Sequence, residues 1–207
     1  MTEEQVRETE NERPWLSWIC DSKTTEELRS KYNNWANTYD TDVKEHWYFM
    51  PINTALILAN LLLKKDAAIL DAGAGTGLVG EALAQLGYTN ITAADLSEEM
   101  LMVAQKKQVY KALHQCNLEN PQAFSKNEIF DAIISVGVFA YAHAGVRVLQ
   151  NLFRHLKTGG YFILTVRGKY RDEMQKAFES LPWNLISQEQ FNVYDSQVIY
   201  VLVFRKQ

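Results

Sequence analysis

The chain has 207 residues, 47% of them hydrophobic and 22% charged, a balance typical of one globular domain. The formal net charge of −4 provides no overall basic field, which disfavours duplex nucleic acid as a partner. The two cysteines have neither metal-ligand nor redox spacing, which favours free thiols in a reducing compartment. Residues 1–13 lack the apolar core of a signal peptide, and the strongest apolar stretch, residues 56–63, is too short to span a bilayer. We therefore expect a cytoplasmic or nuclear protein that does not enter membranes.

The N-terminal quarter has a different pattern from the remainder of the chain. Residues 1–13 are predicted to be a disordered tail and residues 14–50 a helical extension, ahead of a core over residues 51–207. Polar residues that favour a helix start precede apolar and aromatic positions with helical spacing over residues 28–39. The charged residues 40–45 predict a turn, after which Pro51 begins a second helix that runs to Lys65.

From residue 67 onward the sequence alternates between predicted strands and predicted helices. The strands are residues 67–72, 91–95, 112–117, 132–136 and 161–167, and the helices are residues 78–86, 98–107, 146–156 and 172–181. Such alternation predicts an α/β fold with a mainly parallel sheet and helices on both faces. Two late strands, residues 185–191 and 198–204, have no helix between them and should form an antiparallel pair. A seven-stranded, mostly parallel, Rossmann-like sheet is therefore expected.

A glycine-rich loop follows the first predicted strand of the core. Asp71 ends that strand, Gly73, Gly75 and Gly77 follow, and Asp95 ends the next strand. Glycines let the backbone turn sharply and pass close to a ligand. An acid at the end of the second strand is placed to accept hydrogen bonds from a ribose diol. The pattern predicts a site for a cofactor that contains adenosine.

The same loop admits a second interpretation. Gly75, Gly77 and Gly80 also match the dinucleotide-binding fingerprint, with Asp95 at the usual distance. Against this alternative, Asp71 would place negative charge beside a diphosphate. The chain also leaves little room for the second domain or catalytic pair of a dehydrogenase, and the antiparallel strand pair is foreign to the six-stranded dinucleotide topology. A small NAD(P)-dependent oxidoreductase stays the weaker alternative.

The chain resembles the class I S-adenosylmethionine-dependent methyltransferases. The residues that carry this match are 69–77 (ILDAGAGTG), 95–97 with 100–101, 130–132 and 156–161. Within that superfamily it is similar to the Williams–Beuren-region methyltransferase-like proteins, through residues 135–139 with 141–143 and residues 165–167. The resemblance implies S-adenosylmethionine as cofactor, S-adenosylhomocysteine as product, and an N-terminal helical lid over the cofactor. No metal is expected, because the sequence has no His/Cys/Asp cluster with metal-ligand spacing.

The resemblance also implies a role for individual residues. Asp71 and the backbone of Gly73 would hold the amino acid portion of the cofactor, and Asp95 would accept both ribose hydroxyls. Asn117 stands where many members have an acid that accepts from the adenine amino group, and its amide oxygen can still accept. The full set of expected cofactor-binding residues is Tyr39, Trp47, Asp71, Gly73, Ala74, Gly75, Gly77, Leu78, Asp95, Leu96, Met100, Asn117, Leu118, Ser135 and Val136. Tyr32 and Trp35 are interpreted as packing residues.

The residues after the fourth core strand would border the transferred methyl group. Tyr141 and His143 are the candidate catalytic residues there. The chain lacks the Asn/Asp-Pro-Pro-aromatic tetrapeptide of enzymes that methylate planar amino groups of adenine or glutamine, which disfavours those acceptors. A small molecule or a protein is the favoured acceptor, and a monomer is expected. A non-catalytic, cofactor-binding partner subunit stays open as an alternative from another functional class.

Overall fold

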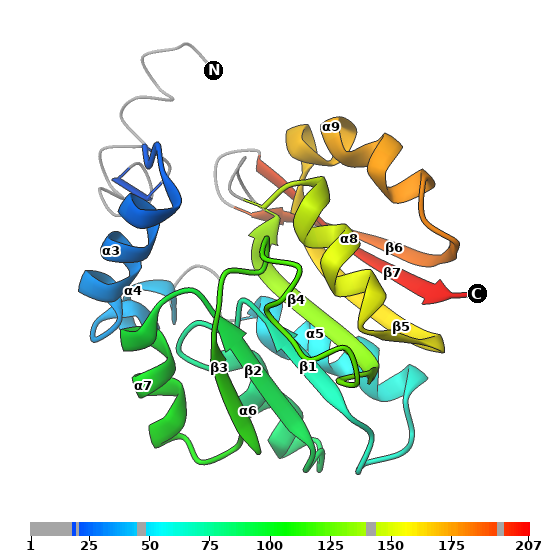
Figure 1. Cartoon of the computed structure of the whole chain (residues 1–207), viewed down its shortest axis with the longest axis horizontal. Coiled ribbons are helices and arrows are strands. Elements are labelled where there is room, and N and C mark those ends of the chain that lie inside the picture. The colour runs from blue at the N-terminus through cyan, green and yellow to red at the C-terminus, as the bar shows by residue number, and fades with distance from the viewer. Residues whose placement is uncertain (1–17, 20, 45–48, 140–143, 194–196) are drawn as a thin grey trace.

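The computed structural model describes residues 18–19, 21–44, 49–139, 144–193 and 197–207. One twisted sheet forms the centre of the molecule, and helices cover both of its faces (Figure 1). Its strands are β1 Ile69–Ala72, β2 Ile91–Asp95, β3 Ala112–Gln115, β4 Phe130–Phe139, β5 Leu156–Arg167, β6 Trp183–Val193 and β7 Gln197–Lys206. The helices are α3 Thr25–Trp35, α4 Tyr39–Lys44, α5 Phe49–Leu61, α6 Leu78–Gln85, α7 Glu98–Lys106, α8 Val146–Arg154 and α9 Gly168–Glu179.

The strand order of the sheet is β3-β2-β1-β4-β5-β7-β6. Strands β1 to β5 pair in parallel, whereas β7 is antiparallel to both β5 and β6. The predicted mostly parallel, seven-stranded sheet with an antiparallel C-terminal pair is confirmed. The order reverses between β1 and β4, so the loops after these two strands diverge and leave a crevice at their carboxyl ends.

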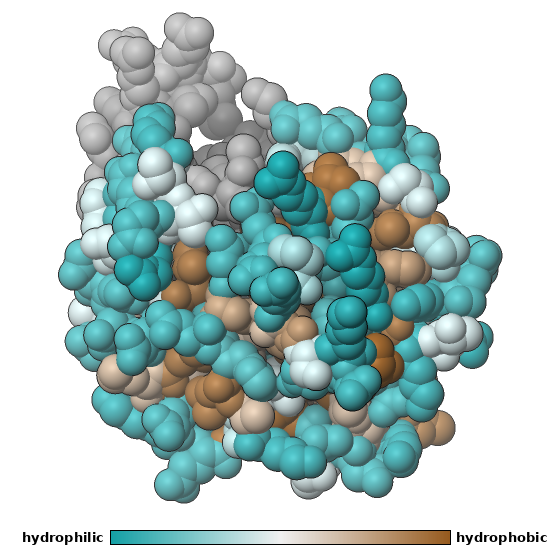
Figure 2. Space-filling view, viewed as in Figure 1, coloured by the Kyte–Doolittle hydropathy of each residue, from teal (hydrophilic) through white to brown (hydrophobic). Residues whose placement is uncertain are grey.

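Two hydrophobic layers hold the helices to the sheet. On one face, Leu70, Ile133 and Phe162 belong to the cluster that includes α8 and α9. On the other face, Ile69 and Ile134 belong to the cluster that includes α5 and α6. Strand side chains alternate between faces, so parallel strands that are buried on both sides read as continuous apolar runs. On the side drawn in Figure 2, a largely polar surface surrounds apolar side chains that lie in the recesses.

The N-terminal extension differs from its prediction. Helix α4 occupies the charged stretch that was expected to be a turn. Asp42 accepts hydrogen bonds from Trp35 Nε1 (2.6 Å) and Thr38 Oγ1 (2.9 Å), which fastens this short helix to the end of α3. Helix α5 begins at Phe49, so the predicted boundary between extension and core falls inside its first turn, where Pro51 is still tolerated.

Two core strands are longer than the sequence indicates. Strand β4, predicted to end at residue 136, continues through Gly137, which has a φ of 79°, and reaches Phe139 after a register shift. Strand β5 begins at Leu156, the last residue of the predicted helix and five residues ahead of the predicted strand. A β-carbon on Gly160 would lie 2.7 Å from the Asp131 carbonyl oxygen, so a glycine is needed where these strands approach. The remaining boundary errors are small: β3 ends at Gln115, α5 ends at Leu61 instead of Lys65, and α9 begins four residues and ends two residues ahead of its prediction.

Candidate active site

A cavity of about 790 Å³ lies at the carboxyl ends of β1, β2 and β4, beneath the N-terminal extension. The loops after β1 and β3 and the beginning of α8 also contribute to its walls. Among the expected cofactor-binding residues, those that line it are Tyr39, Gly73, Gly75, Leu78, Asp95, Leu96, Met100, Asn117, Leu118 and Val136. Residues spread over more than ninety positions of sequence thus meet in one place.

Four expected residues do not line this cavity. Ser135 is buried, and its hydroxyl donates to the Ala72 carbonyl oxygen (2.8 Å), which ties β4 to β1. Ala74 packs with Ala93 and Leu101 under the loop. Gly77, at φ 90°, is the N-cap of α6. The fourth, Asp71, lies beneath the loop. Trp47, Tyr141 and His143 lie outside the described residues.

The glycine loop is fastened to the end of β2 by backbone hydrogen bonds. The N–H groups of Gly73 and Ala74 donate to the Ala94 carbonyl oxygen at 2.8 and 3.0 Å. Gly73 and Gly75 have φ values of 77° and 53°, which side chains rarely adopt. A β-carbon on Gly75 would meet no atom within 4 Å, so the loop opens to the cavity there.

Asp95 supplies the carboxylate on the cavity floor. One oxygen accepts from the Gly75 N–H (2.8 Å) and the other from the Ser97 N–H (2.9 Å). Burial raises the pKa of Asp95, and the nearby backbone N–H groups oppose that rise. Each carboxylate oxygen can accept a further hydrogen bond. Asp95 is therefore held rigidly and can still accept from two hydroxyl groups.

Asp71 occupies a different environment from Asp95. It is 1% exposed, and its Oδ2 accepts a hydrogen bond from the Tyr110 hydroxyl (2.6 Å). Its Oδ1 makes no hydrogen bond within the described part of the chain. Burial, with a smaller contribution from the charge of Asp95, raises the pKa of Asp71 to about 7. Asp71 thus lies as a buried carboxyl group under the loop, and its expected contact with the cofactor stays a prediction.

The extension forms the roof of the cavity and is clamped to the floor. The Ser97 hydroxyl donates to Asn33 Oδ1 of α3 (2.6 Å), and the Thr76 hydroxyl in the glycine loop donates to Asp40 of α4. Asp40 also pairs with Lys107 (2.9 Å). Tyr32, Trp35 and Tyr39, whose rings are in contact, both pack and line the cavity, so interpreting Tyr32 and Trp35 as packing residues was incomplete.

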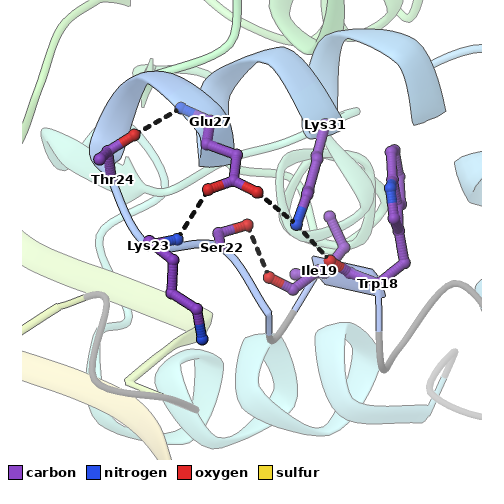
Figure 3. A network of polar contacts seen from close by, with 7 residues as sticks. All are labelled: Trp18, Ile19, Ser22, Lys23, Thr24, Glu27 and Lys31. Carbon is purple, nitrogen blue, oxygen red and sulfur yellow. Dashed lines mark hydrogen bonds and ion pairs between the residues drawn. The ribbon is translucent and has the colours of Figure 1, made fainter.

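The outer rim of the roof is a polar network around Lys31 (Figure 3). The Lys31 ammonium donates to the Trp18 carbonyl oxygen (2.6 Å) and pairs with Glu27 (3.1 Å). The Glu27 carboxylate also accepts from the Lys23 N–H, while Thr24 caps α3. The rim residues that line the cavity, all missed by the sequence analysis as site residues, are Ile19, Ser22, Lys23, Thr24 and Thr25. The only sequence pattern at these residues was the helix-capping pattern Thr-x-x-Glu, from Thr24 to Glu27, which predicts a helix start and no binding site.

The bulge in β4 forms another wall of the cavity. Val136, Gly137 and Val138 are consecutive and all line the cavity, because the register shift interrupts the usual alternation of faces. The Gly137 N–H donates to Thr165 Oγ1 (2.8 Å), which fixes the bulge. A β-carbon on Gly73 would lie 2.1 Å from Val138 Cγ2, so this valine touches the glycine loop.

The loop after β3 closes one end of the cavity. Asn117 Oδ1 accepts from the Glu119 N–H (2.9 Å), which orients the side chain and leaves one lone pair of this oxygen for a further donor. The Asn151 side chain of α8 donates to the carbonyl oxygens of Leu118 and Glu119 and holds this loop. Burial raises the pKa of the Cys116 thiol, which lines the cavity, to about 11. That thiol stays protonated and is no nucleophile.

Comparison with known proteins agrees with this geometry. Residues 70–164 match the family described as "Methyltransferase domain". Human methyltransferase-like protein 27 is 31% identical over 172 residues, which are 82% of this chain and 69% of that protein. The chain belongs to the class I S-adenosylmethionine-dependent methyltransferases. Malonyl-[acyl-carrier protein] O-methyltransferase of Bacillus cereus is 36% identical over 68% of this chain, which spans about half (52%) of that relative's length.

Solved structures show the same methyltransferase fold. A TehB-like S-adenosylmethionine-dependent methyltransferase from Corynebacterium glutamicum superposes with a TM-score of 0.65 over 86% of this chain and 99% of the other, at 20% identity. The [4+2]-cyclase SpnF superposes with a TM-score of 0.74 over 89% and 97% of the two chains, at 13% identity. At these identities the likeness shows the fold alone, and SpnF is named for a reaction other than methyl transfer.

The residues of the cavity fit the cofactor that this methyltransferase family implies. Asp95 offers two acceptor oxygens for a ribose diol, and Gly75 leaves the loop open where a ligand would approach. Leu96 and Met100 provide an apolar surface beside Asp95 for a ring. Across the described ranges, no three His, Cys, Asp or Glu side chains gather as a metal site would require. Nor is any helix there long and apolar enough to cross a membrane.

Proposed function

We propose that this methyltransferase binds S-adenosylmethionine on the cavity floor and methylates a neutral or planar acceptor that enters between the roof and the β4 bulge. The observation that carries the proposal is that one cavity combines a carboxylate and an open glycine loop with an apolar lining. Asp95, Gly73 and Gly75 supply the polar groups. Apolar residues from three separate elements also line the cavity: Ile19, Met50, Pro51, Val136 and Val138.

The sulfonium of the cofactor supplies an activated methyl group, so the protein mainly has to align the partners and exclude water. In this proposal Asp95 accepts both ribose hydroxyls and thereby sets the position of the cofactor. Leu96 and Met100 cover the adenine ring. The buried Asp71 places negative charge under the loop, opposite the positive charges of the cofactor. Tyr141 and His143 follow the β4 bulge directly in sequence and remain the candidates for contact with the acceptor.

The roof completes the proposed site as a lid. Helices α3 and α4 contact the floor through Met100, the Ser97–Asn33 bond and the Thr76–Asp40 bond. These contacts involve the glycine loop and the segment after Asp95, both of which would touch the cofactor. Bound cofactor should therefore favour the closed roof. We further propose that the protein acts as a monomer in the cytoplasm or nucleus, on a small molecule or a protein.

Methyl-labelled S-adenosylmethionine, incubated with fractionated cell extract and the purified protein, tests the proposal. We expect label to enter a small-molecule or protein fraction with the parent protein, and not with Asp95→Ala. Label that enters only RNA would contradict the proposed acceptor class. No labelled fraction, together with a stable co-purifying protein, would favour the non-catalytic partner subunit instead.

A further inference from the structure

Tyr110 lies outside every motif in the sequence and nevertheless contacts Asp71, Gly77 and Gly80 beneath the cavity. It stands between α7 and β3, and its half-buried ring packs with Ala74, Ala93 and Leu101. Its hydroxyl donates to Asp71 Oδ2 (2.6 Å). We propose that Tyr110 is a positioning residue that holds both the Asp71 carboxyl group and the glycine turn in the geometry that binds the cofactor. The proposal rests on the assignment of S-adenosylmethionine to this cavity.

The ring of Tyr110 determines how closely α6 approaches the sheet. A β-carbon on Gly80 would lie 2.2 Å from Tyr110 Cζ and 2.3 Å from its hydroxyl oxygen. A β-carbon on Gly77 would lie 2.9 Å from the same ring, at Cε2. Side chains at either position would displace the ring or the helix. This contact gives a physical reason for the third glycine of the dinucleotide-like pattern without a diphosphate.

The hydroxyl of Tyr110 acts on the charge of Asp71. The described groups that influence this carboxyl are Tyr110 itself, the Gly80 N–H of α6, which weakly favours the charged form, and Asp95 of β2, which opposes it. Lys107, at the end of α7, pairs with Asp40 and Glu81, and no lysine is among the described groups that influence Asp71. The phenol is thus the one side-chain donor to Asp71 among the described residues. A hydrogen bond to the charged form lowers a carboxyl pKa.

Cofactor binding should therefore be coupled to a proton. Positive charge on the ligand favours ionised Asp71, so binding below about pH 7 releases a proton and is weaker than above it. Removing the phenol raises the pKa of Asp71 further and moves this dependence to higher pH. A purely structural tyrosine would change stability without moving the pH profile.

The test is calorimetric titration of the full chain with S-adenosylhomocysteine between pH 5.5 and 8.5, for the parent and Tyr110→Phe. The phenylalanine keeps the ring against Gly77 and Gly80 and removes only the hydroxyl. We expect the pH midpoint of affinity to rise by about one pH unit, with about tenfold weaker binding at pH 6 and a smaller deficit at pH 8.5. Tyr88→Phe, which loses a buried hydroxyl bond to the Leu62 carbonyl oxygen, is the matched control and should keep the parental profile.

Two further measurements distinguish a failure of the Tyr110 proposal from a failure of the cofactor assignment. Carbon NMR of the ligand-free protein should give a higher Asp71 midpoint in Tyr110→Phe than in the parent. Gly80→Ala should weaken S-adenosylhomocysteine binding in the parent and much less in a Tyr110→Ala background. If the parent and Tyr110→Phe have identical Asp71 titration midpoints and identical affinities for S-adenosylhomocysteine, the proposed role of Tyr110 is overturned and the cofactor assignment is not. A parent that binds no S-adenosylhomocysteine at any pH overturns the cofactor assignment and this proposal with it.

Discussion

The floor and the roof of the cavity are built in different ways. On the floor, backbone N–H groups of Gly73, Ala74 and Gly75 donate to the end of β2, over a short span of sequence. On the roof, side chains such as Asn33 and Asp40 reach residues more than thirty positions away. The comparison teaches that backbone contacts between the glycine loop and the neighbouring strand specify the floor, whereas side-chain contacts between segments far apart in the sequence hold the roof.

The largest expected effect comes from the floor. Asp95→Ala should weaken S-adenosylhomocysteine binding by roughly 2–4 kcal/mol, about 30- to 1,000-fold, because two charge-assisted hydrogen bonds are lost. Asp95→Asn should lose less, because its oxygen can still accept. Calorimetry measures both. Asp131→Asn, at a strand-end acid that pairs with Lys157 outside the cavity, is the control. Unchanged affinity of Asp95→Ala would show that Asp95 only fastens the loop.

A second floor prediction concerns stability and pH. Asp71 has a raised pKa of about 7 when folded, so the folded state binds the extra proton between about pH 4 and 7, and this group's contribution to stability falls as pH rises through that window. Relative to Asp71→Asn, the parent should lose about 3 kcal/mol between pH 5 and 8. Urea unfolding of both proteins at the two pH values measures the difference. A pH-independent difference would mean that Asp71 is not protonated in the folded protein.

The third prediction concerns the clamp between roof and floor. Asp40→Ala removes the Thr76 hydroxyl bond and the half-exposed pair with Lys107. The pair is worth at most about 1 kcal/mol, so we expect about 5- to 10-fold weaker cofactor binding from the two losses together. Asp42→Ala, which breaks contacts inside the extension but none to the floor, is the matched comparison. Equal cofactor affinities for Asp40→Ala and Asp42→Ala would show that the Asp40 contacts between roof and floor do not support cofactor binding.

The smallest expected effect is a change in mobility without mutation. If the roof is a lid, amide hydrogen exchange in α3 and α4 should slow when S-adenosylhomocysteine is bound, whereas β7 changes little. Peptides that cover residues 25–44 report the roof, and peptides that cover residues 198–206, which do not line the cavity, serve as the internal reference. Equal exchange around Tyr39 with and without ligand would contradict the lid.

The same contrast explains what the sequence could predict. The parallel strands, the loop and Asp95 follow from apolar runs, glycines and an acid at fixed spacing, all of which are local signals. Helix α4 depends on the Trp35 and Thr38 bonds to Asp42, and the β4 bulge on Thr165, which no local pattern reveals. One signal was available for Asp71. Alternation along β1 places it on the face of Ile69, which packs against α5 and α6, so its burial could have been predicted.

Direct binding of S-adenosylhomocysteine to the purified full chain, with NAD titrated in parallel, tests the central claim most directly. The account predicts one-site binding of S-adenosylhomocysteine that is abolished or strongly weakened by Asp95→Ala, and no heat from NAD. Binding of NAD with no response to S-adenosylhomocysteine would contradict it, because the glycine loop and Asp95 would then serve a dinucleotide.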